Sequence, residues 1–302
     1  MNKKKSYQPL VSIIINCYNG ETYLNDAINS VLSQTYKNWE IVFWDNKSKD
    51  KSAEIFKSFR DDRFKYFYAD HHTSLYKARN LAIEKTKGEL IAFIDSDDLW
   101  VQNKLELQVP LFKNLKIFLA YSNLWIIKKT LKKKRLFIKK NSPSGFIYES
   151  LLDDYNVGII TTIFRKSILD HKEHMFDERF SIMGDFDFFL RLSKSHYFHY
   201  TNIPLAFYRI HKNNFSAINS QKQMEEWDIW FKENENLIDL KKLNKIKKQI
   251  NIRKLLYFKF NKDHKNCYKI LSQNFKSISI IKMLIIVITP LFVLKKVSWF
   301  HS

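Results

Sequence analysis

Residues 89–98 read Glu-Leu-Ile-Ala-Phe-Ile-Asp-Ser-Asp-Asp, an apolar run that ends in three carboxylates. The apolar part predicts a buried β-strand. Asp is depleted in strands and costly to bury without a partner, so three at a strand end indicate a bound cation. Mg²⁺ and Mn²⁺ suit clustered carboxylate oxygens and commonly also hold phosphates. The alternative is an acidic loop in which Asp98 caps a helix that begins at Leu99.

Strand and helix patterns alternate along the first hundred residues. Strands are predicted at 10–16, 39–44, 64–68 and 89–94, and helices at 22–34, 51–59 and 78–85, the last closed by Gly88 as its C-cap. This alternation predicts βαβ units and a largely parallel sheet. Ligands of such sheets bind outside the carboxyl ends of the strands. We therefore expect the polar segments 16–19, 45–50 and 95–98 to meet at one edge.

The second half of the chain has a less regular pattern. Helices are expected at 104–112 and 184–191, where Asp187 and Arg191 have ion-pair spacing, and strands at 117–127, 197–200 and 206–211. From about residue 216 the pattern is helical and rich in Lys. The predicted fold class is α/β, a mostly parallel, Rossmann-like sheet flanked by helices, with a helical C-terminal extension. The predicted domains are residues 1–215 and 216–302.

Composition indicates a folded protein. The chain has 302 residues, of which 45% are hydrophobic and 16% aromatic, which excludes a disordered chain. Cys17 and Cys267 match no metal or redox spacing and are expected to be unpaired thiols in a reducing compartment. The N-terminal MNKKKSYQPL lacks the apolar region of a secretory signal, so a cytoplasmic protein is expected.

The formal net charge is +20, and the basic residues are unevenly distributed. Residues 128–140 hold eight Lys or Arg out of thirteen, and residues 241–254 are a second basic stretch. Nucleic acid, anionic lipid, phosphorylated small molecules or a solvated face could each explain such stretches. Residues 278–294 are strongly apolar but too short to span a membrane. They predict either an in-plane anchor, with Lys295, Lys296 and Trp299 at the headgroups, or a helix packed on the protein's own core.

Four segments resemble the family 2 glycosyltransferases with a GT-A fold, in their residues, order and spacing. They are residues 11–46, 77–100, 176–193 and 208–214, and the resemblance spans about residues 9–215. It implies an inverting transfer of a sugar from a nucleotide-diphosphate donor to a glycan or lipid-linked acceptor. It also implies a nucleotide-sugar half at about 9–112 and an acceptor half at about 113–215.

The resemblance assigns a metal site and a base. Asp97 matches the family's metal ligand, Asp95 the first acid of the same motif, and His211 a late histidine that completes coordination of Mn²⁺ or Mg²⁺. Asp98 would orient its neighbours. Asp185 matches the general base that takes the proton of the acceptor hydroxyl. The family usually has Glu before this base, whereas this chain has Gly184.

The resemblance also implies a nucleotide site. Its residues are Asn16, Tyr18, Asn19, Asp45, Asn46, Arg79, Asp95 and Ser96. Asp45 matches the acid that accepts from the ring N–H of uracil, which favours a UDP-sugar donor. This chain departs from the family with Asn16 in place of a common Pro, the amide Asn46 in place of an acid, and Tyr76 in place of a common glycine.

These features together predict a transferase of surface polysaccharide or lipopolysaccharide synthesis, peripheral on the inner face of the cytoplasmic membrane, with no nucleic-acid partner. Two alternatives are a metal-dependent nucleotidyltransferase and a basic nucleic-acid-binding protein. The first lacks a Gly-rich phosphate loop near the N-terminus and leaves Asp185 and His211 without a role. The second leaves the Asp-bearing strand ends unexplained.

Overall fold

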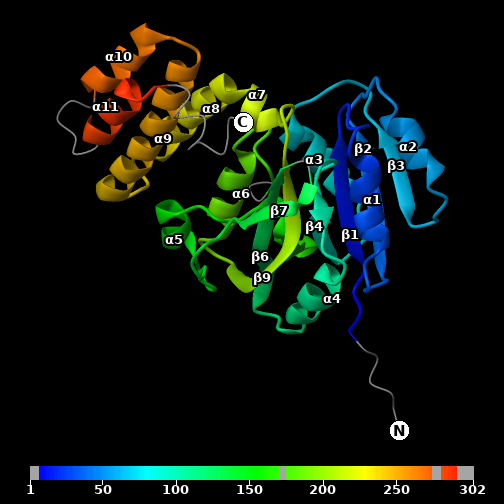
Figure 1. The fold of residues 1–302 in the computed structure, drawn as a ribbon. Coiled ribbons are helices and arrows are strands. Elements are labelled where there is room, and N and C mark those ends of the chain that lie inside the picture. Colours follow the sequence, from blue (N-terminus) through cyan, green and yellow to red (C-terminus); the bar gives the residue numbers. More distant parts are fainter. Residues whose placement is uncertain (1–6, 129, 170–174, 274–279, 291–302) are drawn as a thin grey trace. The chain divides into compact units, whose positions relative to one another are not determined.

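The computed structural model describes residues 7–128, 130–169, 175–273 and 280–290. The chain divides into two compact units, residues 1–210 and 211–302. The first is an α/β unit built on one sheet, and the described elements of the second are all helices (Figure 1). The predicted fold class, α/β with a helical C-terminal extension, is confirmed.

The first four strands form the parallel part of the sheet, in the order β3-β2-β1-β4. They are β1 (Val11–Cys17), β2 (Trp39–Asp45), β3 (Phe64–Tyr68) and β4 (Leu90–Phe93), connected by α1 (Leu24–Leu32), α2 (Ser52–Ser58) and α3 (Leu75–Glu84). β2 is buried along its whole length, as is typical of a parallel strand with both faces covered. The expected βαβ units are present, and their strands end at one edge.

Beyond β4 the sheet is mixed. Its further elements are β5 (Leu99–Trp100), α4 (Lys104–Gln108), η1 (Val109–Lys113), β6 (Ile117–Lys128), β7 (Thr130–Leu136), α5 (Tyr148–Asp153), η2 (Ile159–Thr161), β8 (Ile163–Arg165), η3 (Lys166–Leu169), α6 (Gly184–Leu192) and β9 (Tyr197–Ile210). β8 pairs antiparallel with β4 and β6, whereas β6 and β9 are parallel. β6 and β7 are antiparallel because a connection this short cannot bring a strand back in the same direction.

Several predicted boundaries are wrong. Helix α3 begins at Leu75, three residues early, because the hydroxyl of Ser74 accepts from the amide of Lys77 and caps it. Gly88 is not a C-cap, since the helix ends at Glu84. A Cβ on Gly88 would lie 2.6 Å from the carbonyl oxygen of Leu10 and from the amide nitrogen of Ser12, so close packing against the start of β1 explains this glycine. The helix expected over 104–112 is a short α-helix followed by the 3₁₀ turn η1. The two strands expected at 197–200 and 206–211 form one continuous strand, β9.

The second unit contains α7 (Phe215–Ile218), α8 (Ser220–Asn234), α9 (Leu240–Phe260), α10 (His264–Gln273) and α11 (Ile280–Ile288). α11 falls within the apolar segment. Its Met283 is buried in a cluster with Leu255, Cys267 and Ile270, whereas Leu284, Ile285 and Ile288 are exposed. One face of α11 thus packs on the unit's own core and another is left to solvent.

No helix within the described ranges is both long enough and apolar enough to cross a membrane. Lys295, Lys296 and Trp299 of the predicted anchor lie outside the described residues.

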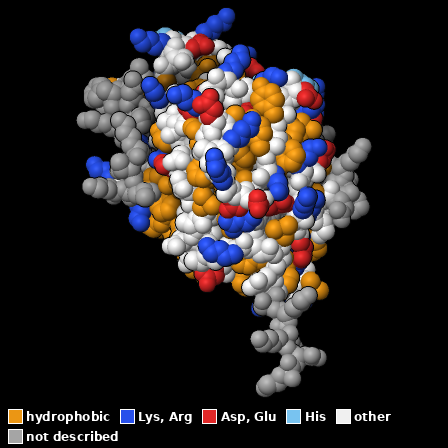
Figure 2. Space-filling view, turned by 90° about the vertical axis from the view of Figure 1, so that its right-hand side faces the viewer, with side chains coloured by type: hydrophobic (Ala, Val, Ile, Leu, Met, Phe, Trp, Pro, Cys, Tyr) orange, Lys and Arg blue, Asp and Glu red, His pale blue; other side chains and the backbone are white. Residues whose placement is uncertain are grey.

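Both cysteines are free and buried, one in each unit. Burial raises the pKa of the Cys17 thiol to about 11, so this thiol stays protonated near neutral pH. Figure 2 shows the face that lies on the right of Figure 1. There, Lys and Arg side chains are scattered among hydrophobic and acidic ones and form no continuous basic track.

Candidate active site

The loops that follow β1 and β2 are fastened to each other. The amide of Asn46 donates to the carbonyl of Cys17 at 2.8 Å. Asn19 has a φ of 54°, a conformation that Asn tolerates better than most residues. Its Oδ1 accepts from the amide of Lys49 at 2.8 Å, and its own amide donates to Ser48 Oγ at 3.0 Å. The two strand ends therefore form one rigid polar edge.

The acidic segment after β4 joins the same edge. The amide of Asp98 donates to the carbonyl of Asp95 at 3.1 Å, which closes a turn over residues 95–98. A Cβ on Gly20 would lie 2.9 Å from Ser96 Oγ, so this turn and the β1 loop approach closely enough to require a glycine. The three polar segments meet as the parallel strand order predicts.

Asp98 is not a helix cap, because the residues after it form strand β5. Its carboxylate is fully buried and accepts from the amide of Arg209 on β9 at 2.8 Å. Arg209 in turn donates from Nε to the carbonyl of Asp97 at 3.0 Å and lies 3.3 Å from the carboxylate of Asp26. Burial, together with the charges of Asp97 and Asp95, raises the pKa of Asp98 well above its usual range. Asp98 and Arg209 thus hold the turn against β9.

Arg79 on α3 is a buried residue, not a surface charge. Its side chain is 3% exposed and its Nη2 lies 2.9 Å from Asp95 Oδ1. The guanidinium is surrounded by the rings of Tyr76, Phe93 and Phe176, with distances to the ring centres of 5.1–5.9 Å. The Asp95 side chain is 35% exposed, so Arg79 holds this carboxylate from the buried side while the carboxylate remains accessible to solvent.

The turn presents two carboxylates close together. Burial raises the pKa of Asp95, Arg79 opposes this shift, and the charge of Asp97 adds to it. Among the described residues, no three His, Cys, Asp or Glu side chains come close enough to form a complete metal centre. Mg²⁺, however, is commonly held by one or two carboxylates together with substrate phosphates. The Asp95 and Asp97 side chains fit a divalent cation of that kind, since such an ion would offset their repulsion.

Asp185 lies in the first turn of α6, near Arg79. Its Oδ1 accepts from the amide of Phe186 at 2.8 Å and from Tyr76 Oη at 3.3 Å. Burial raises the pKa of Asp185, whereas Arg79 and both hydrogen bonds lower it. A carboxylate with a raised pKa is a better proton acceptor than an ordinary Asp. Further along α6, Asp187 forms the expected ion pair with Arg191, at 2.8 Å.

Two departures from the family pattern, Tyr76 and Gly184, contact each other. The Tyr76 ring is 2% exposed, and its hydroxyl also donates to the carbonyl of Ile182 at 3.0 Å. A Cβ on Gly184 would lie 2.5–2.7 Å from three carbons of this ring. Tyr76 therefore fills the space beside the backbone of Gly184, and it places its hydroxyl on Asp185.

A Gly184→Ala variant is expected to lose about 1–3 kcal/mol of stability, because the new methyl group would overlap the buried ring of Tyr76. In a Tyr76→Ala background the same change should cost much less, since the ring is gone. Thermal or urea unfolding of wild type, both single variants and the double variant measures this coupling. Strictly additive losses would contradict the assigned contact.

Asp45 at the end of β2 is fully buried. Its Oδ1 accepts from the amide of Ser48 at 2.7 Å and its Oδ2 from Tyr66 Oη at 2.8 Å. Both oxygens thus already hold the turn after β2 and the neighbouring strand β3. Contact of Asp45 with a uracil ring stays a prediction.

Asn46 ties the loop after β3 to this edge. Its side-chain Nδ2 donates to the carbonyl of Thr73 at 2.9 Å, and its side-chain Oδ1 accepts from the backbone amide of Thr73 at 3.2 Å. Its carbonyl lies 2.9 Å from His72 Nδ1, and the His72 ring packs on Tyr18 with ring centres 4.1 Å apart. Tyr18 is 49% exposed, so this ring pair is open to a ligand. Nearby, both side-chain polar atoms of Asn16 are buried without a hydrogen-bond partner.

His211 is the first residue of the second unit and follows directly on β9. Its amide donates to Asn214 Oδ1 at 2.6 Å, and its Nδ1 accepts from the amide of Asn213 at 3.3 Å. Its role as a metal ligand stays a prediction.

Sequence reasoning missed the positions of three side chains, namely Tyr66, His72 and Tyr155. Tyr66 lies on Asp45 and His72 on Tyr18. Tyr155 packs against Phe186, beside Asp185. A single sequence carries no signal for such contacts, because each joins segments that are brought together only by the fold.

The model of the family described as "Glycosyl transferase family 2" matches residues 12–171. A UDP-Glc:alpha-D-GlcNAc-diphosphoundecaprenol beta-1,3-glucosyltransferase, WfgD of Escherichia coli, is 30% identical over 222 residues, which cover 73% of this chain and 85% of the relative. This similarity favours neither the nucleotidyltransferase nor the nucleic-acid-binding alternative.

Solved structures share the fold. S. aureus TarS 1-349 in complex with UDP aligns with a TM-score of 0.58 at 17% identity, covering 88% of this chain and 91% of that one. The mannosyltransferase PcManGT from Pyrobaculum calidifontis, in complex with GDP-Man and Mn²⁺, aligns with a TM-score of 0.55 at 14% identity, covering 75% and 65%. From the family match, the relative and the fold, this chain belongs to glycosyltransferase family 2 and is a glycosyltransferase of the GT-A type.

Proposed function

We propose that this enzyme transfers a hexose from a UDP-sugar, with inversion, to a sugar carried on a lipid-linked diphosphate in surface polysaccharide or lipopolysaccharide synthesis. The observation that carries the proposal is the network of Asp95, the buried Arg79 and Asp185, in which a carboxylate with a raised pKa lies near the acidic turn. The E. coli relative WfgD is named for transfer from UDP-Glc to a GlcNAc-diphosphoundecaprenol acceptor, which supports this choice of substrates.

Asp185 acts as the general base in this proposal. It takes the proton of the acceptor hydroxyl as that oxygen attacks the anomeric carbon from the face opposite the leaving diphosphate. A single displacement of this kind inverts the anomeric centre. The hydrogen bonds from Phe186 and Tyr76 hold the carboxylate in one orientation, so that its free oxygen is directed to the acceptor.

Asp95 and Asp97 are proposed to hold Mn²⁺ or Mg²⁺. When bound, the cation neutralises charge on the leaving diphosphate. Arg79 keeps Asp95 in position, and Asp98 and Arg209 keep the whole turn in position. The loop around Ser96 is proposed to contact the nucleotide.

The base and ribose are proposed to lie along the edge formed by Asn16, Tyr18, Asn19, Asp45 and Asn46. The exposed Tyr18 ring, backed by His72, offers a surface on which a uracil ring can stack. Asp45 keeps the turn after β2 in shape, and the unpartnered amide of Asn16 is available for hydrogen bonds to the nucleotide.

The lipid-linked acceptor requires the enzyme to work at a membrane. We propose peripheral attachment through the exposed apolar residues of α11, namely Leu284, Ile285 and Ile288. The basic stretch 241–254, which lies on α9, would add attraction to anionic lipid headgroups.

Calorimetric titration of the wild-type enzyme with UDP, GDP and dTDP, with and without Mn²⁺, tests the donor. UDP is expected to bind, and Mn²⁺ is expected to raise its affinity at least about tenfold, equivalent to about 1.4 kcal/mol. The matched transfer assay measures UDP release from UDP-glucose in the presence of an alkyl-diphosphate-linked GlcNAc. Binding of none of the three nucleotides, together with tight, salt-sensitive binding of RNA, would overturn the proposal.

A further inference from the structure

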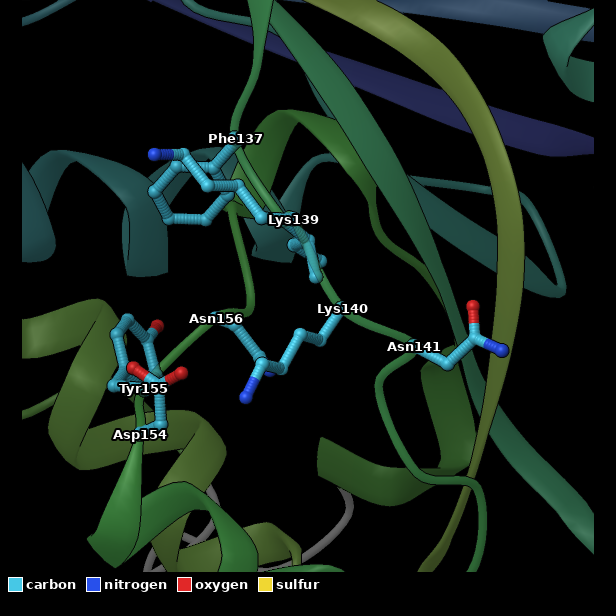
Figure 3. A pocket seen from close by; sticks show the side chains of 8 residues that line it. Phe137, Lys139, Lys140, Asn141, Asp154, Tyr155 and Asn156 are labelled. Carbon is cyan, nitrogen blue, oxygen red and sulfur yellow. The ribbon is translucent and has the colours of Figure 1, made fainter.

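A pocket of about 390 Å³ lies in the acceptor half of the first unit, apart from the acidic turn. It is formed by two segments, one after β7 and one after α5 (Figure 3). The lining residues are Phe137, Ile138, Lys139, Lys140, Asn141, Asp154, Tyr155 and Asn156. Neither segment has a role in the nucleotide site described above.

The pocket shares a wall with the proposed base. The Tyr155 ring packs edge-on against Phe186, with ring centres 5.1 Å apart, and Phe186 is the residue next to Asp185. Burial and the nearby charge of Asp185 both raise the pKa of the Tyr155 hydroxyl. The side chain of Tyr155 therefore connects the pocket to the segment that carries the proposed base.

The two sides of the pocket differ in chemistry. Lys139 and Lys140 are exposed, and within the described ranges neither ammonium has an ion-pair or hydrogen-bond partner. Figure 3 shows the Lys140 side chain extending from one segment toward Asn156 on the other. Asp154 lies on the other segment of the pocket. Its carboxylate can accept hydrogen bonds from sugar hydroxyls, and its negative charge repels phosphate. The cationic side thus offers two unpaired charges to an anion.

The 154–156 segment also has unused hydrogen-bonding capacity. Tyr155 Oη and Asn156 Oδ1 are both buried without a hydrogen-bond partner. Buried polar atoms in folded proteins are nearly always paired, so a small shift of this segment toward a ligand would satisfy them. Two aromatic side chains, Phe137 and Tyr155, add apolar surface of the kind that packs on sugar rings.

We propose that this pocket binds the acceptor as a sugar diphosphate, with Lys139 and Lys140 on the diphosphate and the 154–156 segment on the sugar. The inference rests on the proposed function, and it names the acceptor subsite within that function. It also assigns a role to the end of the basic run 128–140. In the proposed function the phosphates of the nucleotide lie at the acidic turn, so the acceptor and not the donor is the occupant that we propose for this pocket.

The test compares the double variant Lys139→Gln/Lys140→Gln with Lys133→Gln/Lys134→Gln. The control removes the same charge from the same basic run outside the pocket. For an alkyl-diphosphate-linked GlcNAc acceptor, the pocket variant is expected to raise KM and the equilibrium Kd at least about tenfold, as for loss of charge-assisted hydrogen bonds. Its KM for the UDP-sugar and its Kd for UDP should stay at the wild-type values. For a phosphate-free alkyl GlcNAc glycoside, the two variants and wild type should behave alike.

A wild-type Kd for the diphosphate acceptor in the pocket variant would overturn the inference, even if transfer proceeds normally. So would an equal loss in the control variant, or an equal loss with the phosphate-free glycoside. Binding of the acceptor that depends on Lys139 and Lys140 in an enzyme that transfers no sugar would support the pocket and refute the proposed function.

Discussion

An Asp185→Asn variant is expected to bind UDP with wild-type affinity and to lose about 10²–10⁴-fold in kcat, the usual contribution of a general base. The amide is nearly isosteric, so it keeps the bond from Phe186 and the place beside Tyr76, but it cannot take a proton. Single-turnover transfer from UDP-glucose, together with UDP titration, measures the two quantities separately.

Asp187→Asn is the matched control for this experiment, two residues further along α6. It weakens the ion pair with Arg191 and is expected to cost about 1–3 kcal/mol of stability. Its kcat should stay near the wild-type value at a temperature where it is folded. An Asp185→Asn variant that retains full kcat, or an Asp187→Asn variant that loses as much, would contradict the assignment of the base.

The pH dependence of the rate should also identify Asp185 as the base. The base must be ionised to act, and burial raises the pKa of Asp185 above the ordinary Asp value of 3.8, although Arg79 and the two hydrogen bonds oppose that shift. Activity is therefore expected to fall as the pH falls through this raised pKa. The acid limb of kcat/KM should lie above the range of an ordinary Asp, and it should be missing from the residual activity of Asp185→Asn.

Asp97→Asn is expected to abolish the gain in UDP affinity that Mn²⁺ provides and to lower kcat/KM at least about 100-fold, because a bound cation contributes several kcal/mol to charge stabilisation. Removal of divalent ions from wild type with EDTA should reproduce most of this loss. Titration of UDP with and without Mn²⁺ gives the first quantity, and initial rates give the second.

The control for Asp97 is Asp70→Asn, which removes one exposed carboxylate just beyond the end of β3. It should leave both the metal dependence and the rate unchanged. A full Mn²⁺ effect in Asp97→Asn would show that the cation is held elsewhere, and an equal loss in Asp70→Asn would indicate a general effect of charge.

Much of the fold of the first hundred residues followed from the sequence. The alternation of β-branched runs with helical patterns predicted β1 to β4 and their largely parallel pairing, because each element's hydrophobic period is a short-range property. The parallel order then predicted that the polar segments 16–19, 45–50 and 95–98 would meet, since the strands of such a sheet end at one edge. The family resemblance added Asp185, which neither period nor spacing could distinguish from a helix cap.

The contacts that set the chemistry of the site were decided only by the tertiary structure. Tyr76 and Asp185 are 109 residues apart in sequence. In the fold, the ring of Tyr76 fills the space beside Gly184, and its hydroxyl donates to the carboxylate of Asp185. Likewise, the sequence offered Asp45 as a ligand residue, whereas the fold engages both of its oxygens with Ser48 and Tyr66. Local patterns fix which face of an element is apolar. Which side chains meet across the molecule depends on how those faces pack together, and that determines the burial and pKa of each acid.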